Sequence, residues 1–195
     1  MLWQNLISPY VLVLAVTFLL SAAAAASVHR ASRLPAARFV FFMLLAILWQ
    51  LLATIVIEIA PSPALRTAGA KALFAGSAVT VPFFLLFALD YSGFRRISLS
   101  WLLFIWAVPI ATTGLAMTNE FHELIWRTAG ADEGSRIFPK GPAFHVFTAY
   151  VVAGLLSSAV ILFQFAMSLH GFFRRQIYTM ILALFFPLTA FAPKN

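Results

Sequence analysis

Long stretches without a charged side chain dominate this sequence. Six of them come close to the roughly 20 residues that an α-helix needs to cross the hydrocarbon core of a bilayer. They cover residues 1–28, 39–57, 72–89, 97–119, 146–169 and 177–192. With 63% hydrophobic and 10% charged residues, the 195-residue chain also lies outside the usual composition of soluble domains. We therefore expect an all-α integral membrane protein.

Polar and helix-breaking residues between these stretches mark the ends of the expected helices. We expect a single transmembrane helical domain over 1–195, built as a polytopic bundle of six transmembrane helices. The expected spans cover about 4–28, 37–60, 70–92, 97–118, 145–169 and 176–193. The one long polar connection, 121–144, contains glycines and prolines that interrupt regular structure.

The distribution of basic residues predicts the orientation. Three short turns, at 29–38, 90–96 and 170–175, carry Lys and Arg at high density, whereas the basic residues on the other side are spread over longer segments. Because Lys and Arg concentrate in cytoplasmic loops, we expect the dense turns inside and the N-terminus outside. The net charge of +7 is not gathered on one face, so nucleic-acid binding is not expected and contact with the lipid bilayer is.

Residues 118–126, TNEFHELIW, gather charged, imidazole, amide and indole groups in an otherwise apolar chain. If the segment is helical, its apolar residues fall on one face and its polar residues on the other. The polar face would then consist of Asn119, His122, Glu123 and Trp126. This pattern is typical of a short amphipathic helix on a membrane surface, and we expect one on the outer surface between the fourth and fifth spans.

Two ionisable residues lie near the outer ends of the second and third spans. Glu58 and Lys71 are expected to pair and to hold these helix ends together, since ionisable groups at such depth usually face the bundle. With Asn119, His122 and Trp126 they form a candidate binding site for a small polar ligand that arrives from outside.

A structural reading of the same segment stays open. Asn119 or Thr118 would cap the short helix, and Trp126 would anchor it at the level of the lipid headgroups. At the inner side, the carboxylate of Asp90 is expected to neutralise Arg95 or Arg96 across the turn.

The sequence predicts no metal, no cofactor and no catalytic site. It contains no cysteine, and the zinc motif H-E-x-x-H that begins at His122 has Trp126 in place of the second histidine. Haem between His29 and His170 is not expected, because both lie outside the apolar spans, whereas haem ligands in membranes lie deeper. There is no phosphate-binding loop, Ser/His/Asp set or catalytic carboxylate pair.

Several motifs follow one another in the order and spacing of a known family. They are Trp49, Glu58, Lys71, Pro82, FALDYSG at 87–93, Pro109, TNEFHELIW at 118–126, Tyr150, RRQ at 174–176 and Pro187. Along most of the chain they resemble the N-terminal seven-helix membrane input region of bacterial histidine kinases and related diguanylate cyclases. The segment 118–126 is similar to the family pattern T-N-x-x-H-x-L-[IF]-W.

The resemblance implies a non-catalytic sensory module, multi-pass in the inner cell membrane of a bacterium, that couples an extracytoplasmic or membrane signal to a cytoplasmic output. Its partners would be an output domain or other membrane chains, and a second copy in a homodimer. The chain ends where the seventh helix would begin, so we expect a fragment of a longer signalling protein or a relative reused without its output. The alternative function is an accessory transmembrane subunit of a larger membrane complex.

Overall fold

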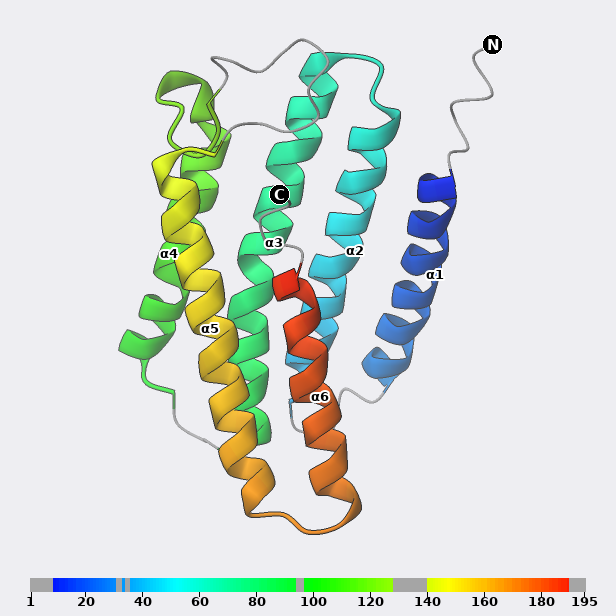
Figure 1. Cartoon of the computed structure of the whole chain (residues 1–195), viewed down its shortest axis with the longest axis vertical. Helices are drawn as coiled ribbons and strands as arrows, with labels where there is room; N and C mark the ends of the chain where they lie inside the picture. Colours follow the sequence, from blue (N-terminus) through cyan, green and yellow to red (C-terminus); the bar gives the residue numbers. More distant parts are fainter. Residues whose placement is uncertain (1–8, 31–32, 34–35, 94–96, 128–139, 190–195) are drawn as a thin grey trace.

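The computed structural model describes residues 9–30, 33, 36–93, 97–127 and 140–189. In these residues the chain forms six α-helices, one short 3-10 helix and no sheet (Figure 1). The α-helices are α1 (Pro9–Arg30), α2 (Ala37–Ile59), α3 (Pro63–Tyr91), α4 (Leu99–Met117), α5 (Pro142–Met167) and α6 (Phe172–Thr189). Successive helices run in opposite directions, so the last residues of α1, α3 and α5 and the first residues of α2, α4 and α6 lie towards one end. We call this the inner end and the opposite one the outer end, following the predicted orientation.

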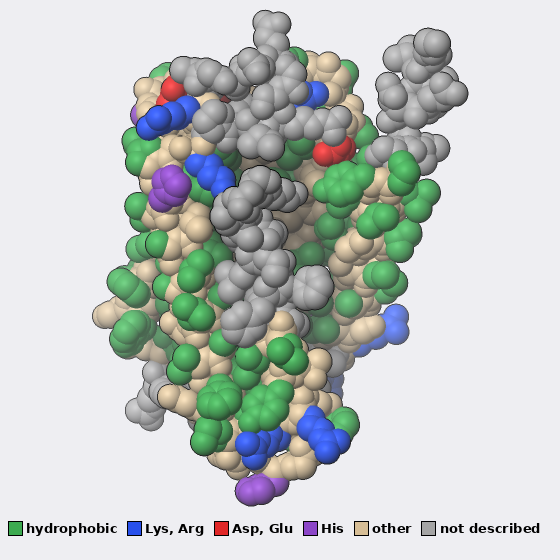
Figure 2. Space-filling model, in the orientation of Figure 1, with side chains coloured by type: hydrophobic (Ala, Val, Ile, Leu, Met, Phe, Trp, Pro, Cys, Tyr) green, Lys and Arg blue, Asp and Glu red, His purple; other side chains and the backbone are tan. Residues whose placement is uncertain are grey.

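Five of the described helices, α1 to α5, are long and apolar enough to cross a membrane. α6, whose first turn carries Arg174 and Arg175, is not among them. Figure 2 shows hydrophobic side chains over the middle of the visible face and Lys and Arg side chains near the helix ends. The all-helical membrane class is thus confirmed, whereas the count of six spans stays a prediction.

α3 is the central helix of the bundle. It contacts α2, α4 and α5, while α1 packs against α2 and α6 packs against α5. Because lipid is as apolar as the core, such helices associate through close packing and hydrogen bonds between them. The core side chains of α3 and α5 that pack together include Phe74, Ala78, Val81 and Phe84 from α3 and Phe147, Val151 and Leu155 from α5.

Hydrogen bonds join α2 to α3 inside the apolar region. The side-chain amide of Gln50 donates to the hydroxyl of Thr80 at 2.8 Å and accepts from the hydroxyl of Ser77 at 3.1 Å. The indole N–H of Trp49 donates to the main-chain oxygen of Ala72 at 2.8 Å. These polar groups therefore have partners within the bundle, as lipid offers none.

α3 begins at Pro63, ahead of the expected start of the third span at residue 70. The hydroxyl of Ser62 accepts a hydrogen bond from the main-chain N–H of Leu65, and Pro63 occupies the first turn, where a missing N–H does no harm. The prediction took Lys71 as the boundary of the apolar stretch. In the structure Lys71 lies well within the helix, together with Arg66.

The prediction of an amphipathic helix at 118–126 is wrong. The segment forms a single 3-10 turn, Asn119–Phe121, and Glu123 has a positive φ of 50° that ends any helical path. Asn119, expected on the polar face, is 4% exposed, whereas Phe121 is 89% exposed and Ile125 is fully buried. The physical reason is that the side chain of Asn119 bonds to main-chain groups of its own loop, which competes with helix formation.

Candidate functional site

Asn119 organises the loop at the outer end of α4. Its side-chain oxygen accepts hydrogen bonds from the main-chain N–H groups of Ile125 at 2.9 Å and Trp126 at 3.1 Å. Its side-chain nitrogen donates to the main-chain oxygen of Trp126 at 2.8 Å. A buried amide with this many internal bonds fixes the shape of the loop. A ligand would have to break these bonds to bind the Asn119 amide directly.

The loop is fastened to the start of α5. Trp126 and Lys140 form an antiparallel bridge, and the main-chain N–H of Gly141 donates to the oxygen of Ile125 at 2.8 Å. Gly141 lies so close to residue 124 that a Cβ atom there would collide with the main-chain oxygen of Leu124. Only glycine fits at this position, because any other side chain would push the loop away from α5.

His122 uses both ring nitrogens inside the loop. Its Nδ1 accepts a hydrogen bond from the main-chain N–H of Leu124 at 3.1 Å, and its Nε2 lies 3.1 Å from the hydroxyl of Thr118. That hydroxyl in turn donates to the main-chain oxygen of Gly114 at 3.0 Å. Since Nδ1 accepts in this network, Nε2 is the ring nitrogen that donates to the Thr118 hydroxyl. His122 thereby ties the loop to the last turn of α4.

Trp126 packs into an aromatic cluster between α3 and α5. Its ring meets the ring of Phe74 edge-on at 5.5 Å between centroids, and Phe74 lies 4.5 Å from Phe147. The ammonium group of Lys140 lies 5.0 Å from the ring centre of Phe144, beside the same cluster. Such edge-on aromatic pairs are favourable beyond their buried area. The half-buried indole thus holds the loop against the central helix.

Lys71 joins α3 to the end of α4. Its ammonium group donates to the main-chain oxygen of Met117 at 2.9 Å and forms an ion pair with the carboxylate of Glu120. The side chain of Lys71 is 17% exposed and that of Glu120 is 54% exposed. The described ion pair of Lys71 is thus with Glu120, whereas its predicted pairing with Glu58 stays a prediction. The reason for the pairing with Glu120 is spatial, because the end of α4 brings both an unpaired carbonyl and a carboxylate to Lys71.

This ion pair shifts the titration of its acidic partner. The hydrogen bond from Lys71 holds the pKa of Glu120 below its usual value, and a backbone hydrogen bond lowers it further. A hydrogen bond to the charged form favours that form, so Glu120 stays a carboxylate at neutral pH. Lys71 and Glu120 are consequently both charged and form an ion pair at the outer end of the bundle.

Asp90 makes the corresponding contact at the inner end of α3. Its carboxylate accepts a hydrogen bond from the main-chain N–H of Ala36 at 2.8 Å and lies 3.9 Å from the guanidinium of Arg38. Ala36 precedes α2 with a left-handed φ of 62°, and its own side chain cannot cap the helix. Asp90 therefore supplies the cap from another helix. The predicted pairing of Asp90 with Arg95 or Arg96 lies outside the described residues.

Four of the five predicted site residues thus meet at one place. Lys71, Asn119, His122 and Trp126 come together in and beside the loop 118–126, whereas Glu58 lies near the end of α2. Sequence reasoning missed Glu120, although an acidic residue just past the fourth span was a signal for a partner of Lys71. The role of the five residues as ligand contacts stays a prediction.

A comparison with known families fits this architecture of apolar helices. Residues 11–193 match the family described as the N-terminal 7TM region of histidine kinase. The chain belongs to this family. No curated protein and no solved structure matches it. The resemblance inferred from the motifs is confirmed, and as a 7TM region of histidine kinase the chain is a sensory, non-catalytic membrane module.

The sequence predicts neither a metal site nor a haem in this 7TM region. Among the described residues, no group of three or more His, Asp or Glu side chains is placed to hold a metal ion. His29 lies in the last turn of α1, with its ring 5.1 Å from that of Phe41, and His170 lies in the turn between α5 and α6. The expectation that the region carries no haem stays a prediction.

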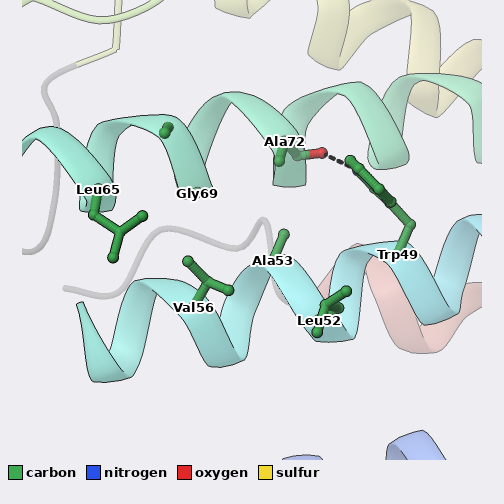
Figure 3. A pocket seen from close by; sticks show the side chains of 8 residues that line it. Trp49, Leu52, Ala53, Val56, Leu65, Gly69 and Ala72 are labelled. Atoms are coloured by element: carbon green, nitrogen blue, oxygen red, sulfur yellow. Dashed lines mark hydrogen bonds between the residues drawn. The ribbon is translucent and has the colours of Figure 1, made fainter.

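An apolar groove of about 220 Å³ lies between α2 and α3 of the 7TM region, in the halves nearer the outer end (Figure 3). Its lining consists of Trp49, Leu52, Ala53, Val56, Leu65, Ala68, Gly69 and Ala72. The one indole N–H in this lining is already bonded to the oxygen of Ala72. The groove therefore presents hydrocarbon and does not suit a small polar ligand.

Proposed function

We propose that this chain is the sensory input module of a bacterial signal-transduction protein, in which α3 couples an extracytoplasmic or membrane signal to a cytoplasmic output. One observation carries the proposal. α3 bears Lys71, which binds the end of α4 at the outer end, and Asp90, which caps α2 at the inner end. Both contacts therefore lie on one helix, on either side of Pro82, which removes one hydrogen bond from the ladder of α3.

The length of α3 suits this role. At a rise of 1.5 Å per residue, Lys71 and Asp90 lie about 28 Å apart along the helix, close to the thickness of the hydrocarbon core. A shift or rotation of α3 that breaks the Lys71 contact also changes the geometry between Asp90 and Ala36. A rigid secondary element with two discrete arrangements is one of the physical carriers of energetic coupling between distant sites.

The loop 118–126 is where the signal acts in this proposal. The candidate ligand contacts are Glu58, Lys71, Asn119, His122 and Trp126. Because the Asn119 amide and both His122 nitrogens are bonded within the loop, a polar ligand acts by replacing these bonds or by competing for Lys71. A ligand that binds the opened loop better than the closed one shifts the population towards the opened state.

The proposal also fixes location and partners. The chain lies in the inner cell membrane with its N-terminus and the loop 118–126 outside, and its inner end faces a cytoplasmic output domain. Two copies form a homodimer through that output. A reporter fused at residue 122 is expected outside the cytoplasm, and a cytoplasmic location for this reporter would contradict the orientation.

The functional test joins residues 1–195 through an added seventh membrane-spanning helix to the dimerisation and catalytic domains of a histidine kinase, so that these domains lie at the inner end. Autophosphorylation is measured in membrane vesicles for Lys71→Gln and Glu120→Gln, with Arg66→Gln as the matched control on α3. Allosteric coupling is typically about 1–3 kcal/mol, so each test variant should change the basal rate about fivefold or more. The control should not.

If both test variants behave like the control at equal expression, transmission through α3 is wrong. In that case, stable co-purification with other membrane chains would favour the accessory-subunit function.

A further inference from the structure

Pro109 interrupts the hydrogen-bond ladder of α4. Proline has no N–H, so the main-chain oxygen of Ile105, four residues earlier, loses its partner within the helix. Pro109 is fully buried and Ile105 is 5% exposed, so water cannot easily replace the missing donor. Inside a membrane such a group must find another donor in the protein.

Tyr150 supplies that donor from the neighbouring helix. Its hydroxyl donates to the main-chain oxygen of Ile105 at 2.7 Å, across 45 residues of sequence. Tyr150 lies on α5, which packs against α4. The interruption made by Pro109 in one helix is thus compensated by one side chain from another.

Thr112 and Gly114 mark the same region of α4 as bendable. The hydroxyl of Thr112, which is 4% exposed, donates back to the main-chain oxygen of Val108 at 2.7 Å. Back-bonding of this kind often bends a helix. A Cβ atom at Gly114 would meet open space, so packing does not stiffen the helix there. The Pro109 region therefore combines the usual causes of a helix bend.

The part of α4 before this region is a poorly supported arm. Residues 99–104 are all exposed, with Leu99 at 71%, Trp101 at 63% and Phe104 at 69%, and Ile105 is the first buried residue. Figure 1 shows the inner half of α4 leaning away from α5. Ser98 caps the arm by accepting from the N–H of Trp101, so it remains a helical unit.

We propose that residues 105–109 form a hinge in α4 and that the hydroxyl of Tyr150 is the latch that sets the position of the arm 99–104. With the hydroxyl bonded, the oxygen of Ile105 is satisfied and the arm has one orientation. Without it, the arm gains freedom to swing, because hydrogen-bond-donating side chains from other helices reach the described residues 105–109 only through Tyr150. The ring contact of Trp106 with Phe83 at 5.2 Å supplies no hydrogen bond. A role of the hinge in sensing rests on the proposed function. The existence of the hinge rests only on the contacts of α4 with α5.

The test therefore uses the purified chain without any output domain. Because the sequence has no cysteine, spin labels can be placed uniquely at Leu103→Cys on the arm and Met167→Cys on α5, both exposed positions. With Tyr150 and Pro109 unchanged, the distance between the two spin labels should show one population. Tyr150→Phe should add a second, displaced population and speed hydrogen exchange of the arm amides about threefold to tenfold, the range expected for one hydrogen bond in a membrane protein.

Pro109→Ala supplies the decisive comparison. It restores an N–H for the oxygen of Ile105, so Pro109→Ala with Tyr150→Phe should return to one population and slow exchange. Tyr91→Phe, a half-buried tyrosine in α3 whose described side-chain contacts are between rings, is the control and should change neither readout.

The latch is wrong if Tyr150→Phe leaves the distances and the exchange rates unchanged, or if Pro109→Ala fails to suppress its effect. Should Tyr150→Phe alone not fold, the double variant must fold, and its failure also overturns the proposal. Because no signalling is measured, failure here leaves the kinase-fusion test of the sensory role unaffected.

Discussion

The ammonium group of Lys71 donates a 2.9 Å hydrogen bond to the main-chain oxygen of Met117, the last residue of α4. The last carbonyls of a helix have no partner within it, and its C-terminus carries a partial negative charge. A largely buried cation from α3 therefore satisfies the end of α4 and places Glu120 beside it. This contact connects the central helix of the bundle to the outer loop.

Removing the charge of Lys71 tests the strength of this connection. Lys71→Met keeps the length of the side chain but leaves the Met117 oxygen without its donor. We expect the free energy of unfolding to fall by about 1.5–3 kcal/mol, as for other hydrogen bonds to charged groups. Unfolding in mixed micelles, followed by circular dichroism, measures it. Arg66→Met, on the same helix and without an ion pair in the described structure, should change little, and equal effects would contradict the contact.

The ion pair also predicts a pH dependence. Lys71 lowers the pKa of Glu120 in the folded state below the ordinary 4.5, so the pair stabilises the fold at pH values above this ordinary pKa. The stabilisation is lost as the pH falls through the lowered pKa, because protonation removes the carboxylate. The melting-temperature difference between the native sequence and Glu120→Gln should be constant above pH 5 and shrink below about pH 4. A difference that grows on acidification would show that the sign is wrong.

Substitution of Asn119 should destabilise the fold far more than its position in a polar loop suggests. Asn119→Asp preserves the shape and the acceptor for Ile125 and Trp126 but replaces the donor to the Trp126 oxygen with a second acceptor. We expect a loss of about 1–3 kcal/mol, since a buried group is left without its partner. Limited proteolysis within 118–127 and Trp fluorescence report the loosened loop. Gln176→Glu, at an exposed amide in the first turns of α6 without a described hydrogen bond, is the control.

Gly141 should tolerate no side chain. In Gly141→Ala the new methyl would meet the main-chain oxygen of Leu124, so the loop must move and stability should fall by about 1–3 kcal/mol. Gly114→Ala is the matched control, because its methyl meets open space and alanine favours a helix interior by about 0.5–1 kcal/mol. Thermal unfolding of the two variants should therefore shift in opposite directions. A neutral Gly141→Ala would refute the close approach of the loop to α5.

Asp90 should act as a hydrogen-bond acceptor more than as a charge. Asp90→Asn retains an oxygen for the N–H of Ala36 and loses only the 3.9 Å attraction to the mostly exposed Arg38, so its cost should stay under about 1 kcal/mol. Asp90→Ala removes the cap and should cost about 1–2 kcal/mol. Hydrogen exchange in the first turn of α2 distinguishes the variants. Equal losses would indicate that the charge dominates.

The helices could be predicted from the sequence because their signal is local. A run of uncharged residues of bilayer length has one low-energy state in lipid, an α-helix, whichever helices surround it. The same holds for the family, since motifs such as 87–93 and 118–126 are read in order along the chain. The Ser62-Pro63 pair also indicates the start of α3, whereas the charge of Lys71 does not end the helix.

The contacts of the site were decided by the tertiary structure. Helical periodicity placed Asn119 on a polar face, yet its amide is buried because it finds main-chain partners at Ile125 and Trp126. Lys71 bonds to the end of α4, and Tyr150 compensates for Pro109 through an oxygen 45 residues away. Hydropathy measures what each residue gains from lipid or water. The partner of a polar group in lipid depends on which unsatisfied donor or acceptor the packed helices bring within about 3 Å.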